Sequence, residues 1–208
     1  MFSGIVEAQA PILNITQSEF TTRFSISRPF IFDDISVGDS VCVDGTCLTV
    51  EEVSDAEICF CLGPETLRLT AWGHSSLQAG KLVNLERSLK LNSRVHGHFV
   101  TGHVDGVVEI VDIERAGDAR WLSLRIPSHL KTYLWTKGSL CLGGVSLTIN
   151  DVDKNIISVC LIPETLRKTN FASLQVGSKL NIEVDSMARA WVHLQKHSPK
   201  GVDLAYDS

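Results

Sequence analysis

Apolar and polar residues alternate along much of this chain with the two-residue period of β-strands. Residues 40–50 and 139–149 alternate on both sides of a glycine turn, a pattern that predicts two β-hairpins. Shorter runs rich in β-branched and other apolar residues occupy 58–62, 82–85, 157–162 and 180–184. Many short strands joined by glycine-containing turns predict an all-β fold made of small closed antiparallel barrels.

The sequence also matches itself when it is shifted by 97 to 99 residues. Residues 60–69 and 159–168 share seven identities in ten, and the matching segments follow one another in the same order in both copies. Such a duplication predicts two pseudo-symmetric barrels in tandem, an N-terminal one at 1–97 and a C-terminal one at 98–187. The matching pairs are 3–7 and 101–105, 41–50 and 140–149, 60–69 and 159–168, and 77–86 and 174–183.

Helical patterns are few. Within the repeats, only the Pro-Glu-Thr-Leu-Arg segments at 64–68 and 163–167 look helical, with proline in the first turn. Each segment carries a Glu-Thr pair, and spacing alone does not decide whether that pair starts the helix or faces a ligand.

The end of the chain, 188–208, lies outside the repeat and is expected to form a C-terminal α-helix followed by a tail. Ser186 is positioned to cap a helix that runs to about His197. Met187, Trp191 and Leu194 would then share one face. This apolar face either packs on the chain's own barrel or joins the subunits of an oligomer.

Composition and charge exclude several function classes. With 208 residues and a net charge of −5, the chain is not expected to bind nucleic acid or other polyanions. No uncharged apolar stretch approaches the roughly 18 residues of a membrane span, and residues 1–7 do not resemble a signal peptide. We therefore expect a cytoplasmic protein with reduced, buried cysteines. The cysteines are Cys42, Cys47, Cys59, Cys61, Cys141 and Cys160.

Three histidines, His96, His98 and His103, form the densest group of titratable side chains. One interpretation is a metal site completed by Asp105 or Glu109. The other is a neutral imidazole that hydrogen-bonds or carries a proton near pH 7. We favour the second, because a His-x-His spacing by itself is common.

Cys47 and Ser146 occupy matching positions in the two repeats, each two residues before a threonine. Residues two apart on a strand share a face, so each repeat presents a thiol or hydroxyl beside Thr49 or Thr148. Small buried residues that satisfy backbone groups are the simpler interpretation, but their recurrence in both copies weakens it. Paired polar pockets suit two copies of one ligand, or two related ligands.

Several motifs together resemble those of the riboflavin synthase family of the alpha chain type, which carries a lumazine-binding repeat. The segments are MFSGIVE at 1–7, GTCLT at 45–49, ETLR at 65–68, GHFVTGHVDG at 97–106, GVSLT at 144–148 and IPETL at 162–166. The resemblance implies two six-stranded Greek-key barrels per subunit and a homotrimer held by C-terminal helices. It also implies active sites between the N-terminal barrel of one subunit and the C-terminal barrel of its neighbour.

The resemblance further implies the last step of riboflavin biosynthesis. Two 6,7-dimethyl-8-ribityllumazine molecules would react, and one would donate four carbons to the other, giving riboflavin and 5-amino-6-(D-ribitylamino)uracil. The reaction would need no cofactor and no metal, since the C7 methyl group of the lumazine is already acidic. The resemblance also suggests association with lumazine synthase.

The resemblance also assigns roles to residues. Cys47 and His103 would carry the chemistry, while Ser146, Thr148 and Asp185 would position groups and relay protons. Lumazine contacts would come from Gly4, Ile5, Val6, Ser40, Cys47, Leu48, Thr49, Cys61, Leu62, Gly63, Pro64, Glu65, Thr66, His98, Gly102, His103, Val104, Lys137, Ser146, Leu147, Thr148, Cys160, Leu161, Ile162, Pro163, Glu164 and Thr165.

Three positions depart from the family pattern. His96 stands where glycine is common, while Gly143 and Cys61 stand where an acid is common. Two alternatives to the enzyme remain: a non-catalytic lumazine-binding protein of the fluorescent antenna kind, and a metal-dependent barrel built on the three histidines. The retained Cys47 and His103 favour the enzyme.

Overall fold

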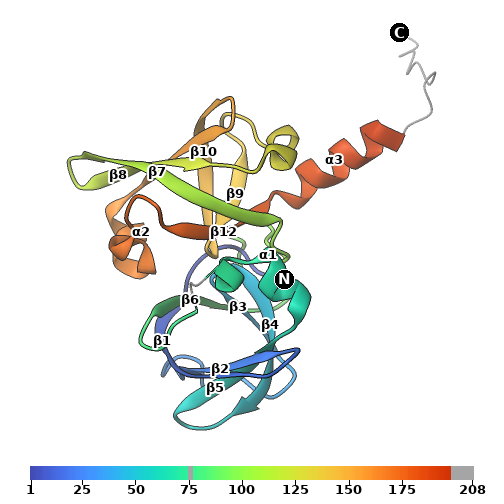
Figure 1. The fold of residues 1–208 in the computed structure, drawn as a ribbon, viewed down its shortest axis with the longest axis vertical. Helices are drawn as coiled ribbons and strands as arrows, with labels where there is room; N and C mark the ends of the chain where they lie inside the picture. Colours follow the sequence, from blue (N-terminus) through green and yellow to red (C-terminus); the bar gives the residue numbers. More distant parts are fainter. Residues whose placement is uncertain (75–76, 198–208) are drawn as a thin grey trace.

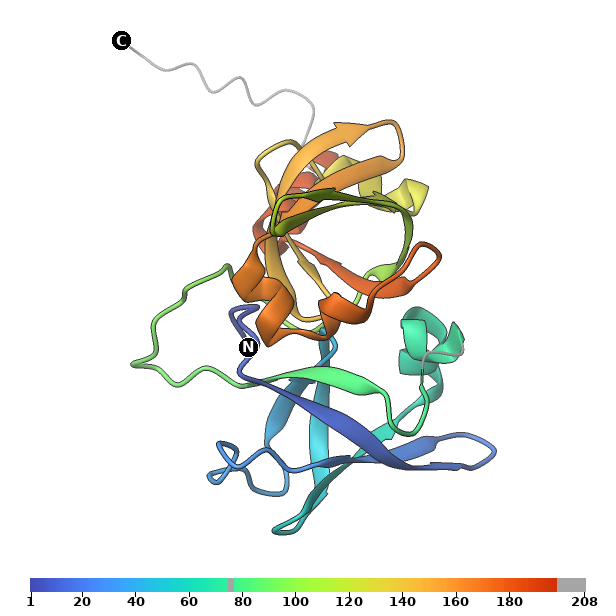
Figure 2. The ribbon, with the colours of Figure 1, turned by 90° about the vertical axis from the view of Figure 1, so that its left-hand side faces the viewer.

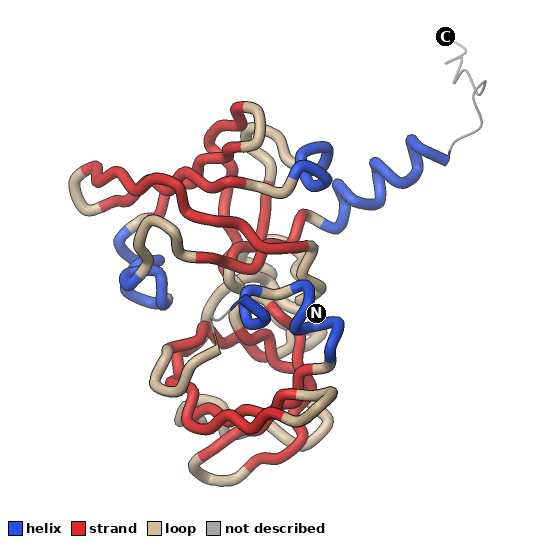
Figure 3. Tube along the Cα trace, viewed as in Figure 1, coloured by secondary structure: helices blue, strands red, loops and turns tan. Residues whose placement is uncertain are grey.

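The computed structural model describes residues 1–74 and 77–197, which form two closed antiparallel β-barrels followed by one helix (Figures 1 and 3). The first barrel contains β1 (Ala8–Gln17), β2 (Thr22–Ser27), β3 (Ser40–Val43), β4 (Thr46–Val53), β5 (Glu57–Leu62) and β6 (Leu82–Arg87). The second contains β7 (Gly106–Ala116), β8 (Ala119–Arg125), β9 (Ser139–Leu142), β10 (Val145–Asp153), β11 (Ile156–Leu161) and β12 (Lys179–Val184). The helices are α1 (Pro64–Leu69), α2 (Pro163–Lys168) and α3 (Ser186–His197).

Both barrels have the same strand order. It is β1-β2-β5-β4-β3-β6 in the first, and the equivalent strands are neighbours in the second. In each, three hairpin-connected strands are followed by a fourth that returns beside the first of them, which is the Greek-key arrangement. The predicted fold of two six-stranded Greek-key barrels with a C-terminal helix is therefore confirmed.

The matching hairpins β3–β4 and β9–β10 turn tightly where the barrels meet. Asp44 and Gly45 have φ angles of 44° and 85°, and Gly143 and Gly144 have φ angles of 48° and 83°. Two successive positive φ angles define the type I′ turn that suits the twist of a two-residue hairpin. A Cβ atom on Gly45 would lie 2.8 Å from the backbone nitrogen of Gly144, so the two turns abut and only glycine fits there.

Because side chains alternate along each strand, apolar side chains fill the interior of each barrel and the side chains between them lie on its outer face. On β5, Ile58, Phe60 and Leu62 are fully buried, while Cys59 and Cys61 point outward and are half-buried. The expectation of six buried cysteines is thus wrong for four of them. Cys47, Cys59, Cys61 and Cys160 are half-buried because they lie on outward faces of strands.

The C-terminal helix α3 projects away from both barrels (Figure 1). The face carrying Met187, Trp191 and Leu194 remains 74%, 65% and 61% exposed, so it does not pack on the chain's own barrel. The predicted N-cap, Ser186, is wrong by one residue: the Asp185 carboxylate accepts the Met187 N–H at 2.9 Å. The predicted tail, 198–208, lies outside the described residues.

Three short 3-10 helices add to the two predicted internal helices: η1 (Ala71–His74), η2 (Ser128–Tyr133) and η3 (Asn170–Ser173). Each of η1 and η3 follows an α-helix of its barrel directly, with Trp72 or Phe171 buried. None of the helices within 1–74 and 77–197 is long and apolar enough to cross a membrane.

Candidate functional site

Each repeat begins with a segment that crosses to the other barrel. Phe2 and Val100 pair in antiparallel fashion beside the hairpins, and the glycines that follow reach the opposite hairpin. Ser146 N–H donates to the Gly4 carbonyl at 2.7 Å, and Cys47 N–H donates to the Gly102 carbonyl at 2.9 Å. The structure therefore pairs Gly4 with the second-barrel serine, and Gly102 with the first-barrel cysteine.

The close approach of these segments requires glycine. Gly4 and Gly102 have φ angles of 74° and 78°, which side chains rarely adopt. A Cβ atom on Gly102 would lie 2.5 Å from the Cys47 Cβ, and one on Gly4 would lie 2.7 Å from the Ser146 Cβ. Each glycine thus places its backbone directly against the side chain expected to do chemistry.

Two buried glutamates hold the crossing segments in place. Glu86 accepts hydrogen bonds from the Ser3 N–H and hydroxyl and from the Gly4 N–H, at 2.7 to 2.9 Å. Glu183 accepts the equivalent three bonds from Thr101 and Gly102, at 2.7 to 2.8 Å. Burial raises the pKa of Glu86, and the bonds from Ser3 and Gly4 partly offset that effect.

Sequence reasoning did not single out Glu86 and Glu183 as site residues. A signal was present, because each closes a recurring Asn-x-Glu segment, at 84–86 and 181–183. Their partners lie 81 to 83 residues away along the chain, which no local pattern shows.

We call the surroundings of Cys47 and Gly102 the first half-site and those of Ser146 and Gly4 the second half-site. In the second half-site, His98 Nδ1 and Ser146 Oγ lie 2.7 Å apart. Burial lowers the pKa of His98, and the neighbouring Asp185 carboxylate partly offsets that effect. The His98 Nε2 is buried and has no hydrogen-bond partner among the described residues. These features agree with a neutral imidazole that bonds the serine hydroxyl, with one nitrogen still available.

The remaining predicted catalytic residues lie on accessible edges of the half-sites. His103 is exposed and follows Gly102, the residue whose carbonyl contacts Cys47. Thr148 is exposed on the outer face of β10, two residues after Ser146. Asp185 caps α3 and lies near His98, so its carboxylate joins the helix to the second half-site.

Three residues of the predicted contact set, Ser40, Cys47 and Thr49, share the outer face of the β3–β4 hairpin. Ser40 lies opposite Thr49 in the β3–β4 register, and Thr49 is exposed beside half-buried Cys47. Leu48 and Leu147, by contrast, point into the barrel cores, and so does Val6, which packs into the second barrel. Only backbone groups of these three residues face the half-sites.

The segments 61–66 and 160–165 form the rim of each barrel where a strand passes into a helix. Leu62 and Leu161 are fully buried, so the outward groups are Cys61, Cys160 and the helix starts. The residues Gly63 and Ile162 precede the helices, and Pro64 and Pro163 open them. Thr66, Thr165 and Val104 are half-buried.

The two rim glutamates do not cap their helices. Glu65 pairs with Arg68 in two bonds, of 2.6 and 2.9 Å, and Glu164 pairs with Arg167 in the same way. Both ion pairs are exposed, and each carboxylate is therefore held along the helix surface. A ligand would meet an arginine–glutamate pair at these positions rather than a free carboxylate.

Lys137 occupies a backbone position that favours glycine. Its φ angle is 70°, and the equivalent residue of the first repeat is Gly38, with a φ angle of 92°. A left-handed conformation costs a side-chain-bearing residue about 1–2 kcal/mol. The second repeat therefore keeps an exposed lysine at a strained backbone position where the first repeat has glycine.

Asp44 is a half-buried acid in the β3–β4 turn, at the edge of a pocket of about 540 Å³ between the barrels. The matching residue of the second repeat is Gly143, which lines the same pocket. Gly143 is one of the two positions where the family commonly has an acid, and the pocket it lines does not include Ser146. Burial raises the pKa of Asp44 to about 6, although Asn84 N–H, Lys81 and the Asn170 amide act in the opposite direction. Asn84 and Asn170 both donate to Oδ1, at 2.8 and 3.0 Å.

Replacing Asp44 by asparagine is expected to stabilise the protein above pH 6. A folded-state pKa above the unfolded value means that stability falls as pH rises from about 4 to about 6. Asp44→Asn removes that slope and should raise the free energy of unfolding at pH 8 by about 1–3 kcal/mol. Urea unfolding at pH 4 and pH 8 measures this, with exposed Asp55→Asn as control. A variant less stable than wild type at pH 8 contradicts the assignment.

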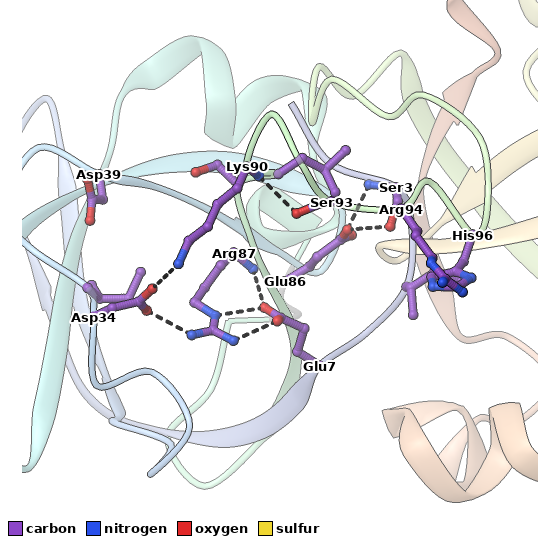
Figure 4. A pocket seen from close by; sticks show the side chains of 14 residues that line it. Ser3, Glu7, Asp34, Asp39, Glu86, Arg87, Lys90, Ser93, Arg94 and His96 are labelled. Carbon is purple, nitrogen blue, oxygen red and sulfur yellow. Dashed lines mark hydrogen bonds and ion pairs between the residues drawn. The ribbon is translucent and has the colours of Figure 1, made fainter.

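A second pocket, of about 490 Å³, lies beside the segment that carries Ser3 and Ile5 (Figure 4). Its wall is an ion-pair network in which Arg87 bonds Glu7 and Asp34 at 2.8 Å and Lys90 bonds Asp34 at 3.0 Å. His96, the family departure, also lines this pocket, on the linker that loops out beside the barrels (Figure 2). The network joins three distant segments, so sequence reasoning did not predict it.

The metal-dependent alternative has no ligand set in the part of the chain that the structure describes. No three His, Cys, Asp or Glu side chains there lie close enough together to hold an ion. His98 is instead committed to Ser146 through Nδ1. The predicted His96–His98–His103 cluster is therefore not brought together around a common point.

Comparison with known proteins agrees with this geometry of two barrels and two equivalent half-sites. The lumazine binding domain family matches residues 3–88 and again 101–185. Riboflavin synthase of Schizosaccharomyces pombe is 40% identical over 193 residues, covering 91% of this chain and 91% of its own. Riboflavin synthase of Escherichia coli is 34% identical over 194 residues, covering 92% and 90%.

Solved structures agree as well. LumP in complex with riboflavin has a TM-score of 0.82 at 27% identity, covering 88% of this chain and 99% of its own. LumP in complex with 6,7-dimethyl-8-(1'-D-ribityl) lumazine has a TM-score of 0.80 at 26% identity, with the same coverage.

Fold and half-sites together define a protein built from two lumazine-binding domains. The chain belongs to the riboflavin synthase family, which confirms the resemblance found in its motifs.

Proposed function

We propose that this chain is the enzyme that forms riboflavin from two molecules of 6,7-dimethyl-8-ribityllumazine. One molecule donates four carbons to the other, and 5-amino-6-(D-ribitylamino)uracil is the second product. The observation that carries this proposal is the exchange of the crossing segments, which gives two half-sites of the same geometry around Cys47 and Ser146. Two copies of one substrate need two such sites.

The half-sites fit a reaction in which the protein orients the substrates and moves protons. The C7 methyl group of the lumazine is acidic because its carbanion is delocalised, so positioning and proton transfer supply most of the catalysis. Cys47 and His103 act at the first half-site, where Gly102 joins them. Ser146, with Thr148 and Asp185 near it, positions groups at the second, and neutral His98 accepts or returns a proton.

Similarity favours the enzyme over a non-catalytic lumazine-binding protein. The riboflavin synthases reported above are 34% and 40% identical to the chain, whereas LumP is 26–27% identical. Cys47, His103 and the surrounding Thr-Gly-His-Val-Asp-Gly segment at 101–106 are all present. The two functions share the ligand and differ in whether it reacts.

We propose that the active subunits form a homotrimer through α3. The exposed Met187, Trp191 and Leu194 face supplies an apolar surface that the chain itself leaves uncovered. In such a trimer, the first half-site of one subunit faces the second half-site of its neighbour. Trp191→Glu should reduce the mass in solution from three chains toward one, as measured by light scattering; an unchanged mass would refute the role of α3.

We further propose a cytoplasmic location and association with lumazine synthase, on family resemblance.

Incubating the purified protein with 6,7-dimethyl-8-ribityllumazine in EDTA tests the function. We expect riboflavin and 5-amino-6-(D-ribitylamino)uracil in equal amounts, followed by flavin absorbance and chromatography. Ligand that binds, by fluorescence quenching, but is recovered unchanged would establish the binding protein instead. Activity that EDTA abolishes and added metal restores would establish the metal-dependent barrel.

A further inference from the structure

Cys42 and Cys47 lie directly opposite each other in the β3–β4 hairpin. The proposed reaction uses Cys47 and has no role for Cys42, and both thiols are free. We propose that the pair is an oxidation site: a peroxide converts the two thiols to a disulfide, which withdraws the Cys47 thiol from the first half-site.

The backbone places the two residues at the spacing that a disulfide needs. Val43 and Thr46 close the two-residue turn, so Cys42 and Cys47 form the next pair, which is not hydrogen-bonded. Accordingly, the Cys47 N–H donates to Gly102 of the other barrel and not to Cys42. Cα atoms in such pairs lie about 4.5 Å apart, within the range of about 4.4–6.8 Å that disulfides span.

Both side chains also point the same way. Val41, Val43 and Leu48 fill the core of the first barrel, so the alternating residues Cys42 and Cys47 face outward. The two cysteines meet in one small cluster between the barrels, with Phe2, Val100 and Cys141. No rotation of either strand is needed to bring the sulfur atoms together.

The second repeat provides an internal control. In the β9–β10 hairpin, Cys141 lies opposite Ser146 at the same register position. Cys141 is as buried as Cys42 and belongs to the same cluster, but it faces a hydroxyl. Only the first hairpin carries two thiols across from each other.

The chemistry balances with one peroxide per disulfide. The Cys47 sulfur, half-buried and the more exposed of the two, attacks a peroxide oxygen; the O–O bond breaks, leaving a sulfenic acid and one water. The Cys42 thiol then loses its proton and attacks the Cys47 sulfur, so that the S–S bond forms and the second water leaves. Because burial raises the pKa of Cys42 well above its usual range, the second step quickens as pH rises.

Mapping of the disulfide tests the proposal directly. The native protein is treated with hydrogen peroxide, its free thiols are alkylated, and it is cleaved before aspartate. Asp44 lies between the cysteines, so peptides 39–43 and 44–54 should be joined, and dithiothreitol should separate them. Cys141→Ala should keep the link and Cys42→Ala should lose it, with Cys42→Ser as a second variant if alanine destabilises the hairpin. Cys47 linked elsewhere, or oxidised to sulfinic acid without a link, overturns the proposal.

The expected effect on activity rests on the proposed function, so riboflavin formation is measured in a separate assay from the disulfide mapping. Riboflavin formation should fall about tenfold or more on oxidation and return with dithiothreitol in wild type and Cys141→Ala. In Cys42→Ala, prolonged peroxide should cause a loss that dithiothreitol does not reverse, because Cys47 proceeds to sulfinic acid. A linked protein with full activity refutes the withdrawal of Cys47. A link in a chain that never forms riboflavin refutes only the proposed function.

Discussion

Replacing His103 by glutamine is expected to slow riboflavin formation by about 10²- to 10⁴-fold, the range that a positioned acid–base group contributes. His103 is exposed and follows the glycine whose carbonyl contacts Cys47, so it lies at the first half-site without supporting the core. Glutamine keeps a hydrogen-bonding side chain of similar reach and cannot exchange a proton near pH 7. Single-turnover kinetics and ligand fluorescence quenching separate the chemical step from binding.

The matched control for this variant is His96→Gln. His96 is also exposed but lies on the linker beside the Arg87 network, and turnover should stay within about twofold of wild type. Cys47→Ser should have a smaller effect than His103→Gln, because it places in the first half-site the hydroxyl that the second already has at Ser146. Loss of binding with unchanged turnover of bound ligand would contradict the role of His103.

Gly102→Ala is expected to lower the free energy of unfolding by about 2–5 kcal/mol and to abolish activity. The positive φ angle accounts for about 1–2 kcal/mol of this loss. The rest follows from a Cβ atom placed 2.5 Å from the Cys47 Cβ and 2.6 Å from its nitrogen, since overpacking costs about 1–3 kcal/mol. Denaturant unfolding and the riboflavin assay give the two readouts.

Gly80→Ala separates the steric effect from the backbone effect. Gly80 has a φ angle of 82°, close to that of Gly102, but a Cβ atom there meets nothing within 4 Å. We expect a loss of only about 1–2 kcal/mol with activity retained. Equal losses for the two variants would show that the contact with Cys47 contributes nothing.

The fold was predictable where the chain alternates regularly, and less so where strands contain bulges. The β3–β4 and β9–β10 hairpins follow directly from alternation around Asp44-Gly45 and Gly143-Gly144. The longest strands, β1 and β7, gave no such pattern. Each has a register shift, between Ile12 and Asn14 and between Ile110 and Asp112, which moves the following side chains to the other face. In β4 and β10 a register shift comes only after Val50 and Ile149, where the regular alternation ends.

The sequence predicts a set of candidate site residues but not how they are arranged. Comparing the repeats matched Cys47 with Ser146 and Gly4 with Gly102, and the family resemblance then assigned the two glycines to the site. It did not show that Gly4 contacts Ser146 or that Glu86 holds Ser3, since those contacts join residues more than 80 positions apart. The strain at Lys137 was equally hidden, because a φ angle is set by the tertiary fold.

The exchange of the leading segments means that neither half of the gene encodes a complete half-site. A fragment ending at residue 97 would retain Cys47 but lose the Gly102 carbonyl beside it, and it would carry Gly4 with no serine to meet. The two leading segments occupy equivalent places, so two copies of one ancestral barrel would exchange these segments with no change in the residues they contact. Duplication and fusion would then have kept a contact that began between separate chains, and each present subunit corresponds in this sense to a dimer whose two barrels are covalently joined.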